Sequence, residues 1–79
     1  MTVQVLFFGA TADITGQRKL KIELPSDAVA GQIFEKLLSD FPALSKHRLH
    51  YSVNEQYATG NEMLNDGDEL AIFTAVSGG

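Results

Sequence analysis

The order of hydrophobic and polar positions predicts two strands near the start of the chain. Residues 3–8 form an apolar run rich in β-branched and aromatic side chains, which is typical of a strand. Residues 9–16 are small and polar with glycine at both ends, which predicts a loop. Apolar and charged residues then alternate through 19–24, the pattern of a half-buried strand. We expect these two strands to pair antiparallel.

Apolar side chains recur at helical spacing over residues 29–40, which predicts one main helix. Ser26 or Asp27 is a candidate N-cap, since its side-chain oxygen could accept from the first free amides. Pro42 disfavours helical geometry in the residue before it, so the helix should end two residues earlier. Gly31 weakens the helix by roughly 1 kcal/mol relative to alanine, and we expect it to let the helix approach the sheet closely.

The rest of the chain predicts short strands and turns. Residues 43–48 look irregular, and Gly67 within residues 65–68 is a strong turn signal. Strands are expected at residues 49–53, 57–58 and 69–73, followed by a flexible tail over residues 74–79. One helix on one face of a mixed sheet gives an α+β fold in a single domain, residues 1–79. A β-grasp arrangement, with the first and last strands parallel at the centre, fits this order.

A single helix leaves one face of the sheet uncovered, and the first and last strands are apolar on both faces. If the helix covers the face of Val5 and Leu70, then Leu6, Phe8 and Phe73 lie on the open face. An exposed aromatic patch usually marks a partner surface. The alternatives are that central strands are simply apolar throughout, or that a loop covers the patch.

Composition narrows the possible chemistry. The formal net charge is −4, which disfavours nucleic acid as a partner. There is no cysteine, and His47 and His50 lack further ligands, so we expect no metal site. No apolar run is long enough for a membrane span, and the N-terminus lacks the pattern of a signal peptide. We therefore expect a cytoplasmic protein that does not contact membranes.

The chain ends in Gly78 and Gly79, after Val76 and Ser77. A glycine pair has no Cβ, so it can enter a narrow slot in any backbone geometry. Such a tail suits insertion into another protein, and the carboxylate of Gly79 would then be the reactive group. The alternative is ordinary terminal fraying or a cloning remnant.

Three segments together resemble one family. They are residues 5–9 (Val-Leu-Phe-Phe-Gly), residues 65–73 (Asn-Asp-Gly-Asp-Glu-Leu-Ala-Ile-Phe) and residues 76–79 (Val-Ser-Gly-Gly). The chain is similar over essentially its whole length to the small subunit of molybdopterin synthase, the MoaD-type sulfur carriers among ubiquitin-like β-grasp proteins. It departs from them in Thr74 and Ala75, where members often carry proline, and in Asp13, where the first loop often carries a basic residue.

The resemblance implies a function for Gly79. An adenylating, E1-like partner uses ATP to activate the terminal carboxylate, and sulfur then replaces AMP to give a thiocarboxylate. The tail, with Val76, Ser77 and Gly78, enters the large synthase subunit, which catalyses sulfur transfer to a pterin precursor in molybdenum cofactor biosynthesis. The small subunit would bind no cofactor, would not be an enzyme on its own, and would act in a hetero-oligomer, with Leu6, Phe8 and Phe73 contacting both partners.

Other functions share this fold. A sulfur carrier for thiamin thiazole synthesis has the same terminal glycine pair, although such carriers are usually shorter and lack the two phenylalanines of the first strand. A ubiquitin-like interaction module, or a modifier conjugated through Gly79, is a further alternative. These functions differ in what happens to the carboxylate of Gly79.

Overall fold

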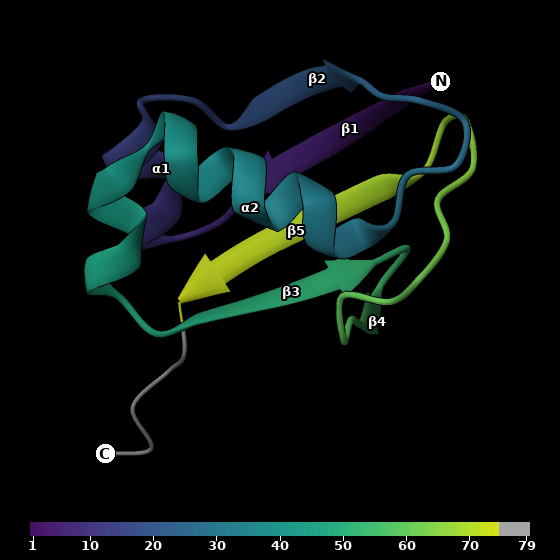
Figure 1. Ribbon diagram of the computed structural model, residues 1–79. Coiled ribbons are helices and arrows are strands. Elements are labelled where there is room, and N and C mark those ends of the chain that lie inside the picture. Colours follow the sequence, from purple (N-terminus) through teal and green to yellow (C-terminus); the bar gives the residue numbers. More distant parts are fainter. Residues whose placement is uncertain (75–79) are drawn as a thin grey trace.

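The computed structural model describes residues 1–74 and contains one five-stranded sheet (Figure 1). The strand order is β2-β1-β5-β3-β4, with β1 and β5 parallel at the centre and all other neighbours antiparallel. This confirms the predicted α+β fold and its β-grasp arrangement. The elements are β1 (Thr2–Phe7), α1 (Ala10–Thr15), β2 (Lys19–Glu23), α2 (Ala30–Asp40), the 3₁₀ helix η1 (Pro42–Lys46), β3 (Leu49–Val53), β4 (Gln56–Tyr57) and β5 (Glu69–Thr74).

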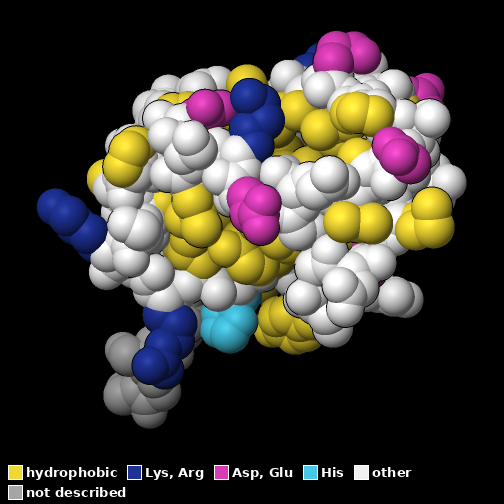
Figure 2. Space-filling view, in the orientation of Figure 1, with side chains coloured by type: hydrophobic (Ala, Val, Ile, Leu, Met, Phe, Trp, Pro, Cys, Tyr) yellow, Lys and Arg dark blue, Asp and Glu magenta, His cyan; other side chains and the backbone are white. Residues whose placement is uncertain are grey.

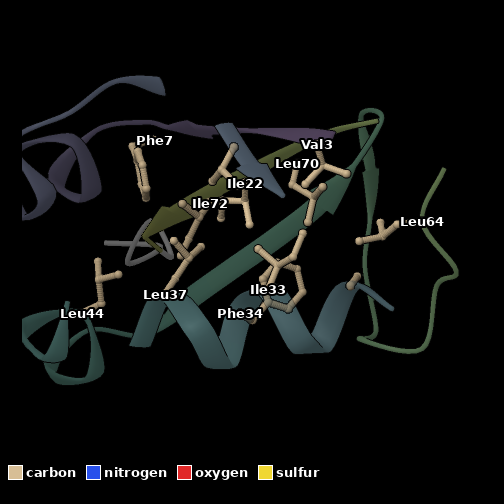
Figure 3. Packing of buried hydrophobic residues seen from close by; sticks show 12 residues of the cluster. Val3, Phe7, Ile22, Ile33, Phe34, Leu37, Leu44, Leu64, Leu70 and Ile72 are labelled. Carbon is tan, nitrogen blue, oxygen red and sulfur yellow. The ribbon is translucent and has the colours of Figure 1, made fainter. Parts of the chain in front are cut away.

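Helix α2 crosses one face of the sheet, and the core lies between them (Figures 1 and 3). Alternate residues of β1 and β5 point into this layer, so Val5 and Leu70 are buried as predicted. Ile33 and Leu37 of α2 are fully buried against them. Each such side chain contributes about 1.5–3 kcal/mol to folding through burial, which fixes the helix to this face alone.

Residues 9–16 were predicted as a loop, and that prediction was wrong. They contain the short helix α1, bounded by Gly9 at φ 58° and Gly16 at φ 71°. Both glycines adopt the positive φ that other residues rarely take, so they mark the two ends of the helix. A helix of six residues has no amphipathic repeat to detect, and its small polar residues are more typical of a loop. A second short element was also missed, because residues 43–48, predicted as irregular, include η1.

Helix α2 ends at Asp40, as predicted, but Ser26 and Asp27 do not cap its start. The N-cap is Val29, which has no side-chain acceptor, and the Gln32 side chain accepts from the Val29 amide at 2.8 Å. Backbone carbonyls of a distant loop accept from the next amides of the helix. These tertiary contacts satisfy the donors that a local cap would otherwise satisfy.

Gly31 allows a close approach, although not to the sheet as predicted. Its amide donates to the carbonyl of Gly60 at 2.8 Å. A Cβ at position 31 would lie 3.0 Å from that carbonyl oxygen, which is tighter than ordinary packing allows. The loop that leads to β5 is therefore held against the start of α2, where Ala30 also donates to Glu62 at 2.9 Å.

Candidate functional site

The face of the sheet opposite α2 carries the predicted patch. Leu6 and Phe73 are half-buried and Phe8 is 51% exposed. All three line one open groove of about 390 Å³, together with Ser52, Glu55, Glu69 and Ala71. The structure therefore brings the three predicted residues together, and within residues 1–74 no loop closes over them.

Two further aromatic residues, which the sequence did not predict there, extend this patch. His50 pairs with Phe73 across β3 and β5, and their rings stack with centroids 5.8 Å apart. Tyr57 of β4 is 76% exposed and lies 6.1 Å from each of these rings. We call Leu6, Phe8, His50, Tyr57 and Phe73 the open-face patch.

The signal for His50 and Tyr57 was present but incomplete. Alternation along residues 49–53 put His50 and Ser52 on one face, yet which face depends on how β3 pairs with β5. That register places Leu49 opposite Thr74 and His50 opposite Phe73. Pairing register between distant strands is not contained in either strand alone.

The open-face patch lies at the end of the sheet that leads to the C-terminus. Strand β5 includes Thr74, which was predicted as the first residue of the tail. Phe73 directly precedes Thr74, and Phe8 follows β1, which runs parallel to β5. Val76, Ser77, Gly78 and Gly79, the predicted tail residues, lie outside the described residues, and their roles stay predictions.

Thr11 of α1 fixes the ends of both central strands. Its hydroxyl oxygen lies 2.6 Å from the carbonyl oxygen of Phe8 and 3.0 Å from that of Ile72, so its single proton is donated between the two carbonyls. The Phe8 amide also donates to the Ile72 carbonyl, at 3.1 Å. Because Thr11 is completely buried, this connection is shielded from water and holds β1 and β5 in place beside the patch.

The titratable groups of residues 1–74 are spread over the fold. Among residues 1–74, no three His, Asp or Glu side chains gather closely enough to hold a metal ion. Amide hydrogen bonds from Thr59 and Gly60 lower the pKa of Glu62 to about 2. Burial raises the pKa of Tyr51, which packs on Phe34 with ring centroids 3.4 Å apart. Glu62 lies beside the start of α2, where its carbonyl oxygen accepts from the Ala30 amide.

Comparison with known proteins gives a family. The ThiS family matches residues 5–79. The chain belongs to the ThiS family. It is 32% identical over 79 residues to the Arabidopsis thaliana molybdopterin synthase sulfur carrier subunit, with 98% of this chain and 82% of that protein covered. None of the helices among residues 1–74 is long and apolar enough to cross a membrane.

Solved structures agree with this assignment. The chain is similar to SAMP1 from Haloferax volcanii, a small archaeal modifier protein, with a TM-score of 0.87 and 28% identity over the full length of both. It is also similar to a chain of the Amycolatopsis orientalis BexX/CysO complex, with a TM-score of 0.66, 26% identity, and 98% of this chain and 99% of that chain covered. These two β-grasp proteins share both the fold and nearly the full length of this chain.

Proposed function

We propose that this chain is the sulfur carrier subunit of a molybdopterin synthase and carries sulfur as a thiocarboxylate on Gly79. The observation that carries this proposal is the similarity to a molybdopterin synthase sulfur carrier subunit over nearly the whole chain. The ThiS family match extends over the terminal Gly78 and Gly79. The open-face patch supports it, because it offers a partner an apolar surface directly beside the start of the tail.

The chemistry begins at the Gly79 carboxylate, which is a poor electrophile. An adenylating partner joins it to the α-phosphate of ATP and releases pyrophosphate. A sulfur nucleophile at the oxidation level of hydrosulfide then attacks the acyl carbon, and AMP leaves with the bonding electron pair. The product is a thiocarboxylate, and no electron transfer is needed. ATP therefore serves the partner, and this chain needs no cofactor of its own.

The second step takes place in the large synthase subunit, which supplies the catalytic groups. The thiocarboxylate sulfur attacks a carbon of the pterin precursor and displaces an oxygen substituent, which leaves with its bonding electron pair and takes up a proton. Water then cleaves the acyl–sulfur bond. Sulfur remains on the pterin, and Gly79 regains its carboxylate. We propose that both partners use the open-face patch in turn, in the cytoplasm, so that the two complexes exclude each other.

Protein modification is the second candidate, because the Haloferax volcanii protein is named a small archaeal modifier protein. A modifier would join Gly79 to a lysine amine by an isopeptide bond, through the same adenylate. A thiazole-pathway carrier would make the same thiocarboxylate as the first proposal and differ only in the acceptor.

The test is reconstitution with the purified adenylating enzyme, a hydrosulfide source, ATP and the large subunit from the same organism. We expect sulfur to reach the pterin precursor, and a variant lacking Gly79 to give none. The matched control is Ser39→Ala, an exposed change on α2 that should leave transfer unchanged. Loading of Gly79 without any transfer to the pterin would contradict the molybdopterin assignment and favour a sister pathway.

A further inference from the structure

The open face carries charges of opposite sign on its two flanks. Facing residues of neighbouring strands point to the same side of a sheet, so the register shows which charges share the face. Lys19 pairs with Leu6, and Lys21 pairs with Gln4, which places both lysines of β2 on the open face. Glu23 pairs with Thr2 and shares this face at the other end of β2, two residues beyond Lys21. Glu69 pairs with Gln4 from the other side and is on the open face as well.

The two grooves beside the patch differ in charge in the same way as the two flanks. Leu6 and Phe8 line two grooves, one on each side of them. The groove toward β2 includes Arg18 and Lys19, and it also includes Asp13. The groove toward β3 includes two carboxylates, Glu55 and Glu69, and no cation.

The flanking charges are exposed and free to act outside the chain. Lys19, Lys21, Glu55 and Glu69 are all exposed. Among residues 1–74 the single ion pair joins Lys36 to Asp40, at 3.2 Å within α2. None of the four flanking groups therefore forms an ion pair with another group among residues 1–74.

We propose that the open face is an orienting surface for a partner protein whose apolar centre is flanked by carboxylates on one side and by Lys or Arg on the other. The carboxylates would face Lys19 and Lys21, and the basic groups would face Glu55 and Glu69. Apolar contacts on the open-face patch are non-directional, whereas the opposed charges favour one orientation and disfavour its reverse. The orientation decides where the tail that follows Thr74 points in the complex. This inference rests on the proposed function for the identity of the partners.

An orienting effect of the flanking charges can be distinguished from general electrostatic attraction. The chain has a net charge of −4, so a purely global effect would depend on that total. A pattern effect depends on which flank carries which sign. Exchanging the two signs keeps the net charge and reverses the pattern.

The test measures binding of the large synthase subunit and of the adenylating enzyme at low and high salt. One double variant is Lys19→Glu with Lys21→Glu, and the other is Glu55→Lys with Glu69→Lys. We expect each to raise Kd for at least one partner about tenfold at low salt, mainly by slowing association, with the difference shrinking at high salt. The quadruple variant, which combines all four changes and keeps the net charge at −4, should bind at least as weakly as either double.

The matched control is Lys36→Glu with Lys46→Glu, which changes the net charge as much as the lysine double but on α2 and η1. Figure 2 shows that the α2 side carries scattered charges of both signs. If the control weakened binding as much as the lysine double, or the quadruple variant bound like the wild type, the proposal would be overturned. Should any reversed variant fail to fold, the Lys→Gln and Glu→Gln pairs should raise Kd about threefold instead.

Two further readouts separate the possible failures. Sedimentation of the chain alone tests whether a second copy occupies the open face. A wild-type dimer that either double variant dissociates would overturn the hetero-partner assignment. Sulfur loading of Gly79 is measured in the same samples. A loaded Gly79 with unchanged affinities in every variant would reject the orienting surface and leave the sulfur-carrier function in place.

Discussion

Thr11 is a buried polar residue at the point where β1 and β5 end, and it should stabilise the fold there. Thr11→Val keeps the shape and removes the hydroxyl that donates to Phe8 and Ile72. Both carbonyls keep an amide donor, so the loss should be about 1 kcal/mol of unfolding free energy. Urea denaturation measures this loss of unfolding free energy. Thr11→Ser, which retains the hydroxyl, should keep most of the wild-type stability. Equal losses for both variants would assign the effect to packing instead.

Gly31 gives a second prediction at the residue scale. Helix propensity alone predicts that Gly31→Ala raises the free energy of unfolding by about 1 kcal/mol. The structure predicts the opposite sign, because the new Cβ would lie 3.0 Å from the Gly60 carbonyl oxygen, which the Gly31 amide also binds. We expect a net loss of about 1–2 kcal/mol by thermal or urea unfolding. Ser39→Ala, on the exposed side of α2, should be neutral or slightly stabilising, and a stabilising Gly31→Ala would contradict the close approach.

The lowered pKa of Glu62 predicts that the stability of the fold depends on pH. Its pKa is about 2 in the folded chain against an ordinary value of 4.5, because the amides of Thr59 and Gly60 donate to the carboxylate at 2.7 and 2.8 Å. A depressed folded pKa means that the contribution is fully present above pH 4.5 and is lost as pH falls toward 2. Glu62→Gln should therefore flatten the loss of stability in this window.

The measurement for Glu62 is the urea midpoint at several pH values between 2 and 7. Glu35→Gln is the matched control, since it removes an exposed carboxylate of α2 and retains Glu62. A Glu62→Gln profile that superimposes on the wild type would contradict the role of these amide hydrogen bonds.

At the scale of elements, the strands and the main helix followed from periodicity, and the short elements did not. The run of residues 3–8 and the alternation of residues 19–24 correspond closely to β1 and β2. Long periodic segments are decided by burial of one face, which the sequence displays directly. Helix α1 is held by two positive-φ glycines and the buried Thr11, so its stability comes from contacts with distant residues.

Strand β5 links the open-face patch to the tail. Substituting Phe73 tests whether this patch binds the partners. Phe73→Glu should weaken both partner complexes at least tenfold, because it places a charge among the rings of His50 and Tyr57. Titration calorimetry or surface plasmon resonance measures the affinities. Met63→Glu is the control, since Met63 is another exposed apolar residue, 69% exposed, on the loop beside α2. Unchanged affinities for Phe73→Glu in a folded protein would remove the patch from the interface.

At the scale of the whole molecule, the candidate site was predicted in part. Leu6, Phe8 and Phe73 followed from counting faces, because one helix covers one face of a sheet. His50 and Tyr57 could not be placed, since the register of β3 against β5 joins residues far apart in the sequence. The charged flanks of the open face depend on strand registers as well. The sequence alone therefore could not show that Lys19, Lys21 and Glu69 lie on the same face of the sheet.

The central claim is that Gly79 carries sulfur, and the direct measurement is the fragment mass of the C-terminus. The protein would be purified from its native source without reductant, and loaded in parallel with the adenylating enzyme, ATP and hydrosulfide. Replacing one carboxylate oxygen by sulfur adds about 16 Da, which matches the nominal shift of oxidation at Met1 or Met63, so fragmentation must place the change. We predict the added mass on Gly79. An unmodified Gly79 after complete loading conditions would contradict the account, and a Gly79 joined to lysine would identify a modifier instead.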